Sequence, residues 1–274
     1  MRSVLDDATA RLRAAGIDSA RFDAELLLAH CLGVERSRLS TVDVPAGLTS
    51  FERLVERRAN REPLQYIVGS APFRYVDVSV GPGVFIPRPE TELLVDAVLP
   101  FLTSASTAVD LCAGSGALAV AIATERPGTK VYAVERSPAA LPWLSRNADP
   151  AGVTVVPGDV ADPALLTDLH DGVDAVVSNP PYVPAGTAVA AEVRADPAEA
   201  VFAGPDGLAV IPAVIARAAD LLRAGGVLAV EHDESHGEVV PELLRAAGAW
   251  RDVTAHRDLA GRPRYATAVR AAAR

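Results

Sequence analysis

The chain has 274 residues, half of which are hydrophobic, and its formal net charge is -9 at pH 7. A chain of this length forms one large domain or two ordinary ones, and the composition allows a sizeable core. The negative net charge argues against nonspecific binding of nucleic-acid phosphates, which needs clustered lysines and arginines. We expect no signal peptide and no membrane span, because the N-terminus contains acidic residues and no apolar stretch reaches the required length.

The cysteine content gives an indication of the compartment. Cys31 and Cys112 are the only two cysteines, and they lie far apart in segments of different character. A disulfide framework is therefore not expected. Reduced thiols in a cytoplasmic protein fit this pattern better.

The first 64 residues show the apolar spacing of helices. In the first helix the apolar residues recur at three- and four-residue steps, at Val4, Leu5, Ala8 and Leu12. A second helix is expected from Ser19 to near Gly33. A third begins at Thr49, where Thr49 and Glu52 have the spacing of a capping box, and ends before Pro63. This pattern predicts a small helical domain over residues 1–64.

Four arginines of this region favour a solvated helix face over a docking patch for a macromolecule: Arg53, Arg57, Arg58 and Arg61.

After residue 64 the spacing of the apolar residues changes from a helical to an extended pattern. QYIVGSAPF and RYVDVSVGPG read as two extended segments joined by a turn, so residues 65–86 are expected to form a β-hairpin linker. The segment 87–92, PRPETE, opens a further helix through about Leu102.

From about residue 106 the pattern alternates between strand and helix. Five apolar stretches read as strands: TAVDLC, KVYAVE, VTVVPG, DAVVSN and GGVLAVEH. This alternation predicts a parallel sheet covered on both faces. The tail contains WRDVTAHRD and RYATAVRA, which favour two antiparallel strands. Residues 87–274 are therefore expected to form an α/β domain, a doubly wound sheet with an antiparallel last strand, and this layout resembles class I methyltransferases.

A glycine-rich turn follows the first of these strands. Val109-Asp110-Leu111-Cys112-Ala113-Gly114-Ser115-Gly116 leads into a helix that begins near Ala117. Glycines let the backbone turn sharply and let a ligand approach it closely. The spacing Gly114-x-Gly116-x-x-Ala119 matches a loose nucleotide-binding fingerprint, which permits NAD, FAD, S-adenosylmethionine or a tight turn without a ligand.

Acidic residues lie at or just after the ends of three predicted strands. Asp110 precedes the glycines, and a carboxylate there suits a ligand with a positive amino group better than a pyrophosphate. Glu135 ends the second strand and can accept hydrogen bonds from two ribose hydroxyls. Asp159 and Val160 follow the third strand, where an adenine edge would lie. An ordinary turn after Gly158 explains Asp159 almost equally well.

The fourth strand ends in Asn179-Pro180-Pro181-Tyr182. A strand that simply ends at prolines does not explain the asparagine before them or the aromatic after them. An amide or exocyclic amino nitrogen is a poor nucleophile, and the Asn179 side-chain oxygen and the Pro180 carbonyl can accept its two N–H bonds. Pro180 and Pro181 fix these acceptors in advance, and Tyr182 can stack on the planar group. The segment predicts a methyltransferase that acts on such a nitrogen.

The chain as a whole resembles the release factor glutamine methyltransferase family (PrmC/HemK). The likeness is carried by REPLQYIVG at 61–69, FIPRPETE at 85–92, Asp110–Gly116, SNPPY, GPDGL at 204–208, Glu231-His232 and DLAGR at 258–262. The resemblance implies N5-methylation of the glutamine in the Gly-Gly-Gln motif of class I peptide release factors. It implies S-adenosylmethionine as cofactor, release factors as partners, and neither a metal nor direct nucleic-acid binding.

The resemblance also assigns roles to individual residues. The cofactor contacts would come from Asp110, Cys112, Ala113, Gly114, Ser115, Gly116, Glu135, Asp159, Val160 and Asn179. The segment Asn179–Tyr182 would also hold the glutamine, Phe85 would help wall the pocket, and the helical domain would help dock the release factor. The sequence departs from the family at Cys112-Ala113, where relatives usually have Gly-Thr, and at Val160, where many have an aromatic residue.

Three other functions remain open at this point. A paralogue would methylate a glutamine of a ribosomal protein. A methyltransferase for DNA or RNA amino groups would need a basic groove or a target-recognition domain. A catalytically idle module that binds S-adenosylmethionine is disfavoured by the intact NPPY segment.

Overall fold

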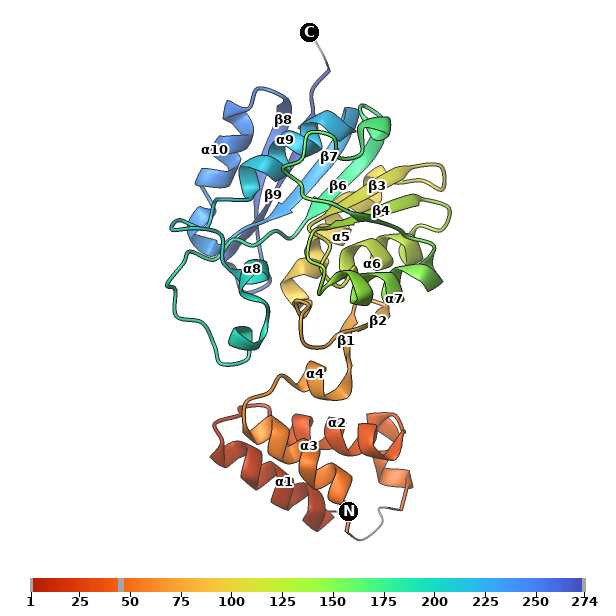
Figure 1. Cartoon of the computed structure of the whole chain (residues 1–274), viewed down its shortest axis with the longest axis vertical. Helices are drawn as coiled ribbons and strands as arrows, with labels where there is room; N and C mark the ends of the chain where they lie inside the picture. Colours follow the sequence, from red (N-terminus) through yellow and green to blue (C-terminus); the bar gives the residue numbers. More distant parts are fainter. Residues whose placement is uncertain (1, 44–46, 273–274) are drawn as a thin grey trace. The chain divides into compact units, whose positions relative to one another are not determined.

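The structure is a computed structural model, and it describes residues 2–43 and 47–272. The chain divides into two compact units (Figure 1). The helical unit comprises Met1–Ser70 and Val189–Ala195, and the sheet unit comprises Ala71–Ala188 and Asp196–Arg274. The chain therefore enters the helical unit twice.

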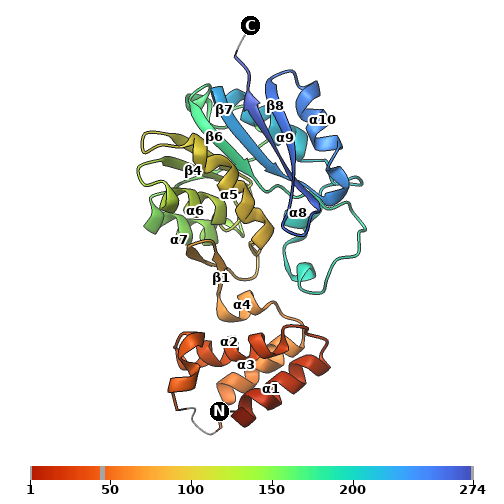
Figure 2. The same ribbon diagram turned by 180° about the vertical axis from the view of Figure 1, so that it is seen from behind.

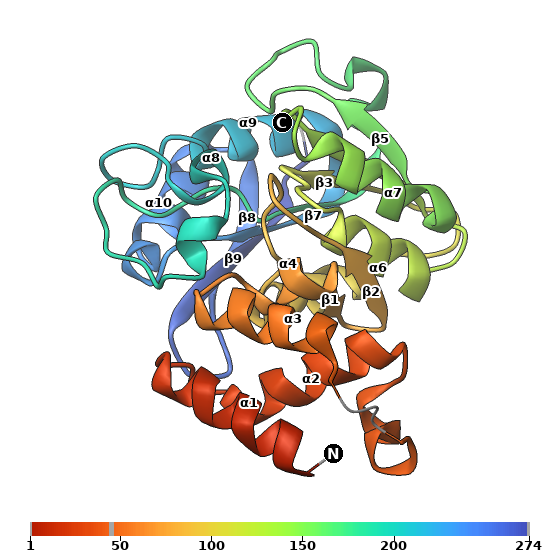
Figure 3. The same ribbon diagram turned by 60° about the horizontal axis from the view of Figure 1, so that its bottom comes forward.

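Short helices pack around one apolar core in the helical unit (Figure 3). They are α1 (Arg2–Ala14), α2 (Ala20–Leu32), the 3-10 helix η1 (Arg36–Thr41), α3 (Thr49–Ala59) and α4 (Leu64–Val68). Leu5, Ala8 and Leu12 are all buried, as their three- and four-residue spacing predicts. Burial of such an apolar face supplies most of the stability of short helices.

Two predictions about helix ends have different outcomes. Gly33 ends α2 as expected, in the left-handed conformation with φ 64°, and its N–H closes the last turn. The capping box at Thr49 and Glu52 does not form, so that prediction is wrong. Leu48 is the N-cap residue and Thr49 is already helical, so the Thr49 hydroxyl lies 3.5 Å from the Gly47 carbonyl instead of capping the helix.

Residues 65–68 are helical, and the prediction of an extended segment there is wrong. The β-branched residues suggested a strand, but Pro63 starts the single turn of α4 and Gly69 ends it at φ 80°. The helical turn buries Leu64 and Ile67. The hairpin strands follow directly, as β1 (Ser70–Phe73) and β2 (Val76–Ser79) of a two-stranded sheet.

Arg58 is buried and does not lie on a solvated helix face as predicted. It pairs with Asp23 at 2.7 Å and with Glu192 at 3.1 Å. Arg61 also pairs with Glu192, at 2.8 Å. A buried guanidinium needs such partners because an uncompensated buried charge is costly. Glu192 belongs to the segment 189–195, so ion pairs hold that segment within the helical unit.

A seven-stranded sheet in the order β5-β4-β3-β6-β7-β9-β8 forms the centre of the sheet unit. Its strands are β3 (Thr107–Leu111), β4 (Lys130–Glu135), β5 (Thr154–Pro157), β6 (Val173–Ser178), β7 (Leu222–Glu231), β8 (Trp250–Arg257) and β9 (Pro263–Arg270). Strands β3 to β7 are parallel, whereas β9 is antiparallel to both β7 and β8. This arrangement confirms the predicted strands and the predicted fold class, the layout of class I methyltransferases.

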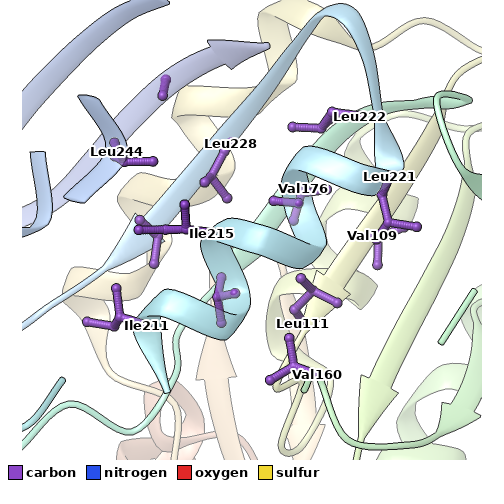
Figure 4. Close-up of a cluster of buried hydrophobic side chains, with 14 of the residues drawn as sticks. Val109, Leu111, Val160, Val176, Ile211, Ile215, Leu221, Leu222, Leu228 and Leu244 are labelled. Carbon is purple, nitrogen blue, oxygen red and sulfur yellow. The ribbon is translucent and has the colours of Figure 1, made fainter. Parts of the chain in front are cut away.

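Helices cover both faces of this sheet (Figures 1 and 2). The helices of the sheet unit are η2 (Pro89–Thr91), α5 (Glu92–Val98), η3 (Leu99–Phe101), α6 (Ala117–Glu125), α7 (Leu141–Ala151), η4 (Thr167–Leu169), α8 (Ala198–Val201), α9 (Ile211–Leu221), η6 (Glu234–His236) and α10 (Val239–Ala246). Helices α5, α6 and α7 contact one another in order, and α9 contacts α10. Figure 4 shows Ile211, Ile215 and Leu221 of α9 among Val176 and Leu228 of the strands, in one buried apolar cluster.

In the ranges that the structure describes, no helix is long and apolar enough to cross a membrane. The same residues contain no group of three or more His, Cys, Asp or Glu side chains that could hold a metal ion.

Candidate functional site

The glycine loop and the NPPY segment start from neighbouring strands. Leu111 at the end of β3 lies opposite Ser178 at the end of β6. The Ser178 hydroxyl donates to the Leu111 carbonyl at 2.6 Å, which ties the two strand ends together. The two segments therefore lie at one carboxyl edge of the sheet, where ligands bind in open parallel sheets.

Residues 112–116 make the turn from β3 into α6. Gly114 and Gly116 are both left-handed, with φ 56° and 84°. The Gly116 N–H closes the turn on the Ala113 carbonyl at 2.8 Å. A Cβ atom at position 116 would lie 2.6 Å from Leu144, whereas one at position 114 would meet nothing within 4 Å. The backbone at Gly114 therefore leaves space beside it for a ligand.

Cys112 begins this turn in the left-handed conformation, at φ 65°. A side chain with a Cβ atom rarely adopts that conformation, and the cysteine stands where the family usually has glycine. Burial raises the pKa of the Cys112 thiol to about 12, and the charges of Glu135 and Asp110 act in the same direction. The thiol therefore stays protonated and is no nucleophile. At the other end of the loop, Ser115 is buried and its carbonyl accepts a hydrogen bond from Asn147 at 2.8 Å.

Asp110 is buried at the end of β3 with half of its carboxyl group unpaired. Oδ2 accepts the Ala119 N–H at 3.2 Å, but Oδ1 has no hydrogen-bond partner among the described residues. Burial raises the pKa of Asp110 well above its usual value, and the charge of Glu135 adds to the rise. A buried carboxylate oxygen without a partner is stabilised most by a hydrogen-bond donor that carries a positive charge.

Glu135 ends β4 and holds the glycine loop from the side. Its Oε2 accepts the Gly114 N–H at 2.8 Å and its Oε1 accepts the Ser137 N–H at 2.7 Å. The carboxylate thus lies at the glycine loop, while its contact with ribose hydroxyls stays a prediction.

Asp159 and Val160 follow β5. The Asp159 carboxylate accepts the Ala161 N–H at 2.9 Å and pairs with Arg136 at 3.3 Å, and these bonds lower its pKa. The turn role of Asp159 is therefore present in the structure, and an adenine contact stays a prediction. Val160 is 5% exposed and packs with the sheet core near Leu111 (Figure 4).

The Asn179 carboxamide has one fixed side and one open side. Its Nδ2 donates to the Thr91 hydroxyl at 3.0 Å. Asn179 Oδ1 and the Pro180 carbonyl accept no hydrogen bond from the described residues. Two acceptors of neighbouring residues are therefore available at the strand end.

The Tyr182 hydroxyl is anchored by a buried carboxyl group. It donates to Glu231 Oε1 at 2.7 Å, and Glu231 is 1% exposed at the end of β7. Burial raises the pKa of Glu231 to about 7, whereas hydrogen bonds from Tyr182 and Thr91 and the charge of Arg264 lower it. Burial and the charge of Glu231 in turn raise the pKa of Tyr182 well above its usual value.

Phe85 lies in a segment that is fixed at its backbone. The Arg88 guanidinium lies over the Phe85 ring at 5.0 Å and forms an ion pair with Asp196. Asp196 also accepts the Ile86 N–H at 3.1 Å. The half-buried Phe85 ring is therefore held in place, while its contact with a substrate stays a prediction.

Sequence reasoning missed Thr91 and undervalued Glu231. Thr91 is the threonine of PRPETE, and Glu231 entered the sequence analysis only as part of the Glu231-His232 pair that carries the family resemblance. Both side chains are buried and reach the NPPY segment directly. The joint presence of PRPETE, NPPY and Glu-His in one chain was the available signal, but the spacing does not reveal which side chains meet.

Two family models match the chain. The PrmC N-terminal domain matches residues 3–69, and the methyltransferase small domain matches residues 77–200.

Relatives match over nearly the whole length. A release factor glutamine methyltransferase of Mycolicibacterium smegmatis is 51% identical over 99% of this chain and 98% of that protein. Proteins of the same name are 46% identical in Streptomyces coelicolor and 44% identical in Corynebacterium glutamicum, each over 96% of both chains. With this identity over this length, the chain belongs to the release factor glutamine methyltransferase family.

Proposed function

We propose that this protein transfers the methyl group of S-adenosylmethionine to the side-chain amide nitrogen, N5, of the glutamine in the Gly-Gly-Gln motif of class I peptide release factors. The observation that carries the proposal is the pair of open acceptors, Asn179 Oδ1 and the Pro180 carbonyl, beside the glycine loop. The names of the relatives support the same substrate.

The residues around the glycine loop fit S-adenosylmethionine. The buried, unpaired Asp110 Oδ1 would accept from the ammonium group of the cofactor. The open backbone at Gly114 would lie against its methionine part, and Glu135 would accept from the ribose hydroxyls. Asp159 and Val160 would line the adenine. When bound, the cofactor supplies an electrophilic methyl group.

The NPPY segment would activate the nitrogen by position and charge. Asn179 Oδ1 and the Pro180 carbonyl accept the two N–H bonds of the glutamine amide, which aims the nitrogen at the methyl group. The same acceptors stabilise the positive charge that develops on nitrogen during transfer. The methylated amide then loses a proton to water without a dedicated base. Pro181 stiffens the segment, and Tyr182 and Phe85 would flank the amide plane.

The remaining parts of the chain have roles in the same proposal. Residues 1–64 would help dock the release factor, residues 65–86 would serve as a linker, and residues 87–274 would carry the chemistry. No direct contact with nucleic acid or membrane is part of it. The proposal includes a cytoplasmic location, because release factors act in the cytoplasm.

The test uses purified protein with methyl-labelled S-adenosylmethionine and four separate acceptors. These are a class I release factor, its variant with alanine in place of the Gly-Gly-Gln glutamine, ribosomal proteins, and DNA. We expect label in the intact release factor alone. Label that appears only in ribosomal protein or DNA, or that persists in the alanine variant, overturns the proposal.

A further inference from the structure

The turn between β8 and β9 holds a large apolar side chain out in the solvent. Leu259 is 97% exposed, the highest value among the large hydrophobic residues in the described ranges. Single exposed apolar residues are common on protein surfaces, so exposure alone does not define a contact site. Leu259 differs from such residues in how firmly its turn is held and in where the turn lies.

The turn, residues 258–262, is fixed by the buried carboxylate of Asp258. Its Oδ1 accepts the N–H groups of Ala260 and Arg262, both at 3.0 Å, and its Oδ2 accepts from Arg262 Nε at 3.0 Å. The Asp258 N–H also closes the turn on the Arg262 carbonyl at 2.8 Å. Two antiparallel strands can be joined by two residues without any buried carboxylate. The backbone that carries Leu259 is therefore ordered in advance, which lowers the entropic cost of binding a partner there.

The turn lies at the same edge of the sheet as the NPPY segment. Strand β9 lies between β7 and β8 and is antiparallel to both (Figure 1). Near its start it pairs Tyr265 with Glu231, the last residue of β7. The Arg264 carbonyl accepts the His232 N–H at 2.9 Å, just beyond the end of β7. The turn 258–262 therefore extends past the carboxyl ends of the parallel strands, where substrates approach.

An ion pair joins the turn to the segment that contacts Asn179. Arg262 lies 3.2 Å from Glu90. Thr91, the next residue along the chain, lies 3.0 Å from the Asn179 Nδ2 atom. All of these residues belong to the sheet unit. A protein that delivers a glutamine to Asn179 must therefore bring the surface around that glutamine close to Leu259.

We propose that Leu259 is an anchor for the release factor, and that its side chain packs against an apolar surface next to the loop that presents the Gly-Gly-Gln glutamine. The inference rests on the function proposed above. Leu259 does not touch the reacting atoms. Its contribution is to the affinity for the protein substrate, and the methyl transfer step does not depend on it.

The test shortens Leu259 and follows KM and kcat separately. Leu259→Ser should raise KM for a class I release factor by roughly 10-fold, because burying a leucine in an interface contributes about that much affinity. The kcat at saturating release factor and the affinity for S-adenosylmethionine, measured by titration calorimetry, should each stay within about twofold of the parent. Leu259→Met keeps a large apolar side chain and should recover most of the loss. The melting temperature should not change, because Leu259 is almost fully exposed.

Tyr75→Ser is the matched control. Tyr75 is 80% exposed on the other hairpin of the sheet unit, between β1 and β2. Arg74 beside it pairs with Glu125 at 2.8 Å. Glu125 is the last residue of α6, which leads from the carboxyl end of β3 toward the amino end of β4, so this hairpin turn lies away from the NPPY edge. The control should keep the parent KM.

A parent KM in Leu259→Ser, an equal rise of KM in Tyr75→Ser, a loss confined to kcat, or failure of Leu259→Met to recover overturns the inference. If the parent enzyme leaves release factors unlabelled, the proposed function fails instead.

Discussion

Gly207 lies directly against the backbone carbonyl of Tyr182. A Cβ atom built at position 207 overlaps that oxygen and lies 2.9 Å from the His236 ring, and the residue has φ 76°. The His236 Nε2 atom lies 2.8 Å from the Asp206 carbonyl, which fixes the loop from the other side. The GPDGL loop therefore packs beneath the NPPY segment without space for a side chain.

Gly207→Ala should displace Tyr182 and slow methyl transfer by about 100-fold, since a shift of about 1 Å at a positioning segment has that effect. Initial rates with a release factor measure this. The control is Gly248→Ala, because Gly248 is also left-handed at φ 69° but a Cβ atom there meets nothing within 4 Å. The control should lose about 1 kcal/mol of stability from backbone strain and keep the parent rate. Equal rates for the two variants would show that the close approach to Tyr182 is unimportant.

Asn179→Ala should slow methyl transfer by about 100- to 1000-fold. Removal of one hydrogen-bonding group that stabilises charge developing in the transition state usually costs about that much. Cofactor binding should largely remain, because Asp110 and the glycine loop are unchanged. Single-turnover rates and titration calorimetry with S-adenosylmethionine separate the two effects. A variant that methylates a release factor at the parent rate would exclude the proposed role of the NPPY segment.

Asp110→Asn should stabilise the protein without cofactor and weaken cofactor binding. The folded-state pKa of Asp110 lies well above the usual 3.8, so folding holds the proton and stability falls as the pH rises from 3.8 through the folded value. The amide has no such cost, and each kcal/mol gained raises the melting temperature by roughly 2–4 °C. Loss of the charge should weaken S-adenosylmethionine binding by about 10-fold or more. Unchanged affinity at pH 7 would contradict the assignment of Oδ1 to the ammonium group.

Glu231 should make the stability of the protein depend on pH near neutrality. Its pKa rises from 4.5 in the unfolded chain to about 7 in the folded protein, so the unfolded state releases the proton first and stability declines between these values. The decline amounts to on the order of 3 kcal/mol for a shift from 4.5 to about 7. Denaturant titrations from pH 4.5 to 8 should show this fall in the parent and a smaller one in Glu231→Gln. Parallel curves would rule out a raised pKa at Glu231.

The succession of strands and helices along the chain and the parallel direction of the first five strands of the sheet were predictable, because both depend on patterns that extend over many residues. The apolar runs ending in Glu135 and Ser178 mark parallel strands, and the rule that ligands bind at their carboxyl ends then placed Asn179 beside the glycine loop.

The errors arose where the outcome depends on contacts between distant residues. Residues 65–68 have strand-like composition, yet burial of Leu64 and Ile67 makes them helical. Arg58 reads as a surface arginine until Asp23 and Glu192 supply its partners. Thr91 is 88 positions from Asn179, and no local sequence pattern predicts the hydrogen bond between their side chains.

Two separate segments of the chain belong to the helical unit, and this affects how truncated forms of the protein can be interpreted. No single cut separates the two units, since a fragment that begins at residue 71 still contains the segment 189–195. In that fragment Glu192, ten residues downstream of Tyr182, would be left without Arg58 and Arg61. An inactive catalytic fragment would therefore not show that the helices bind the substrate. Glu192→Gln in the full-length chain is the fairer comparison, because it weakens the ion pairs and leaves every helix present.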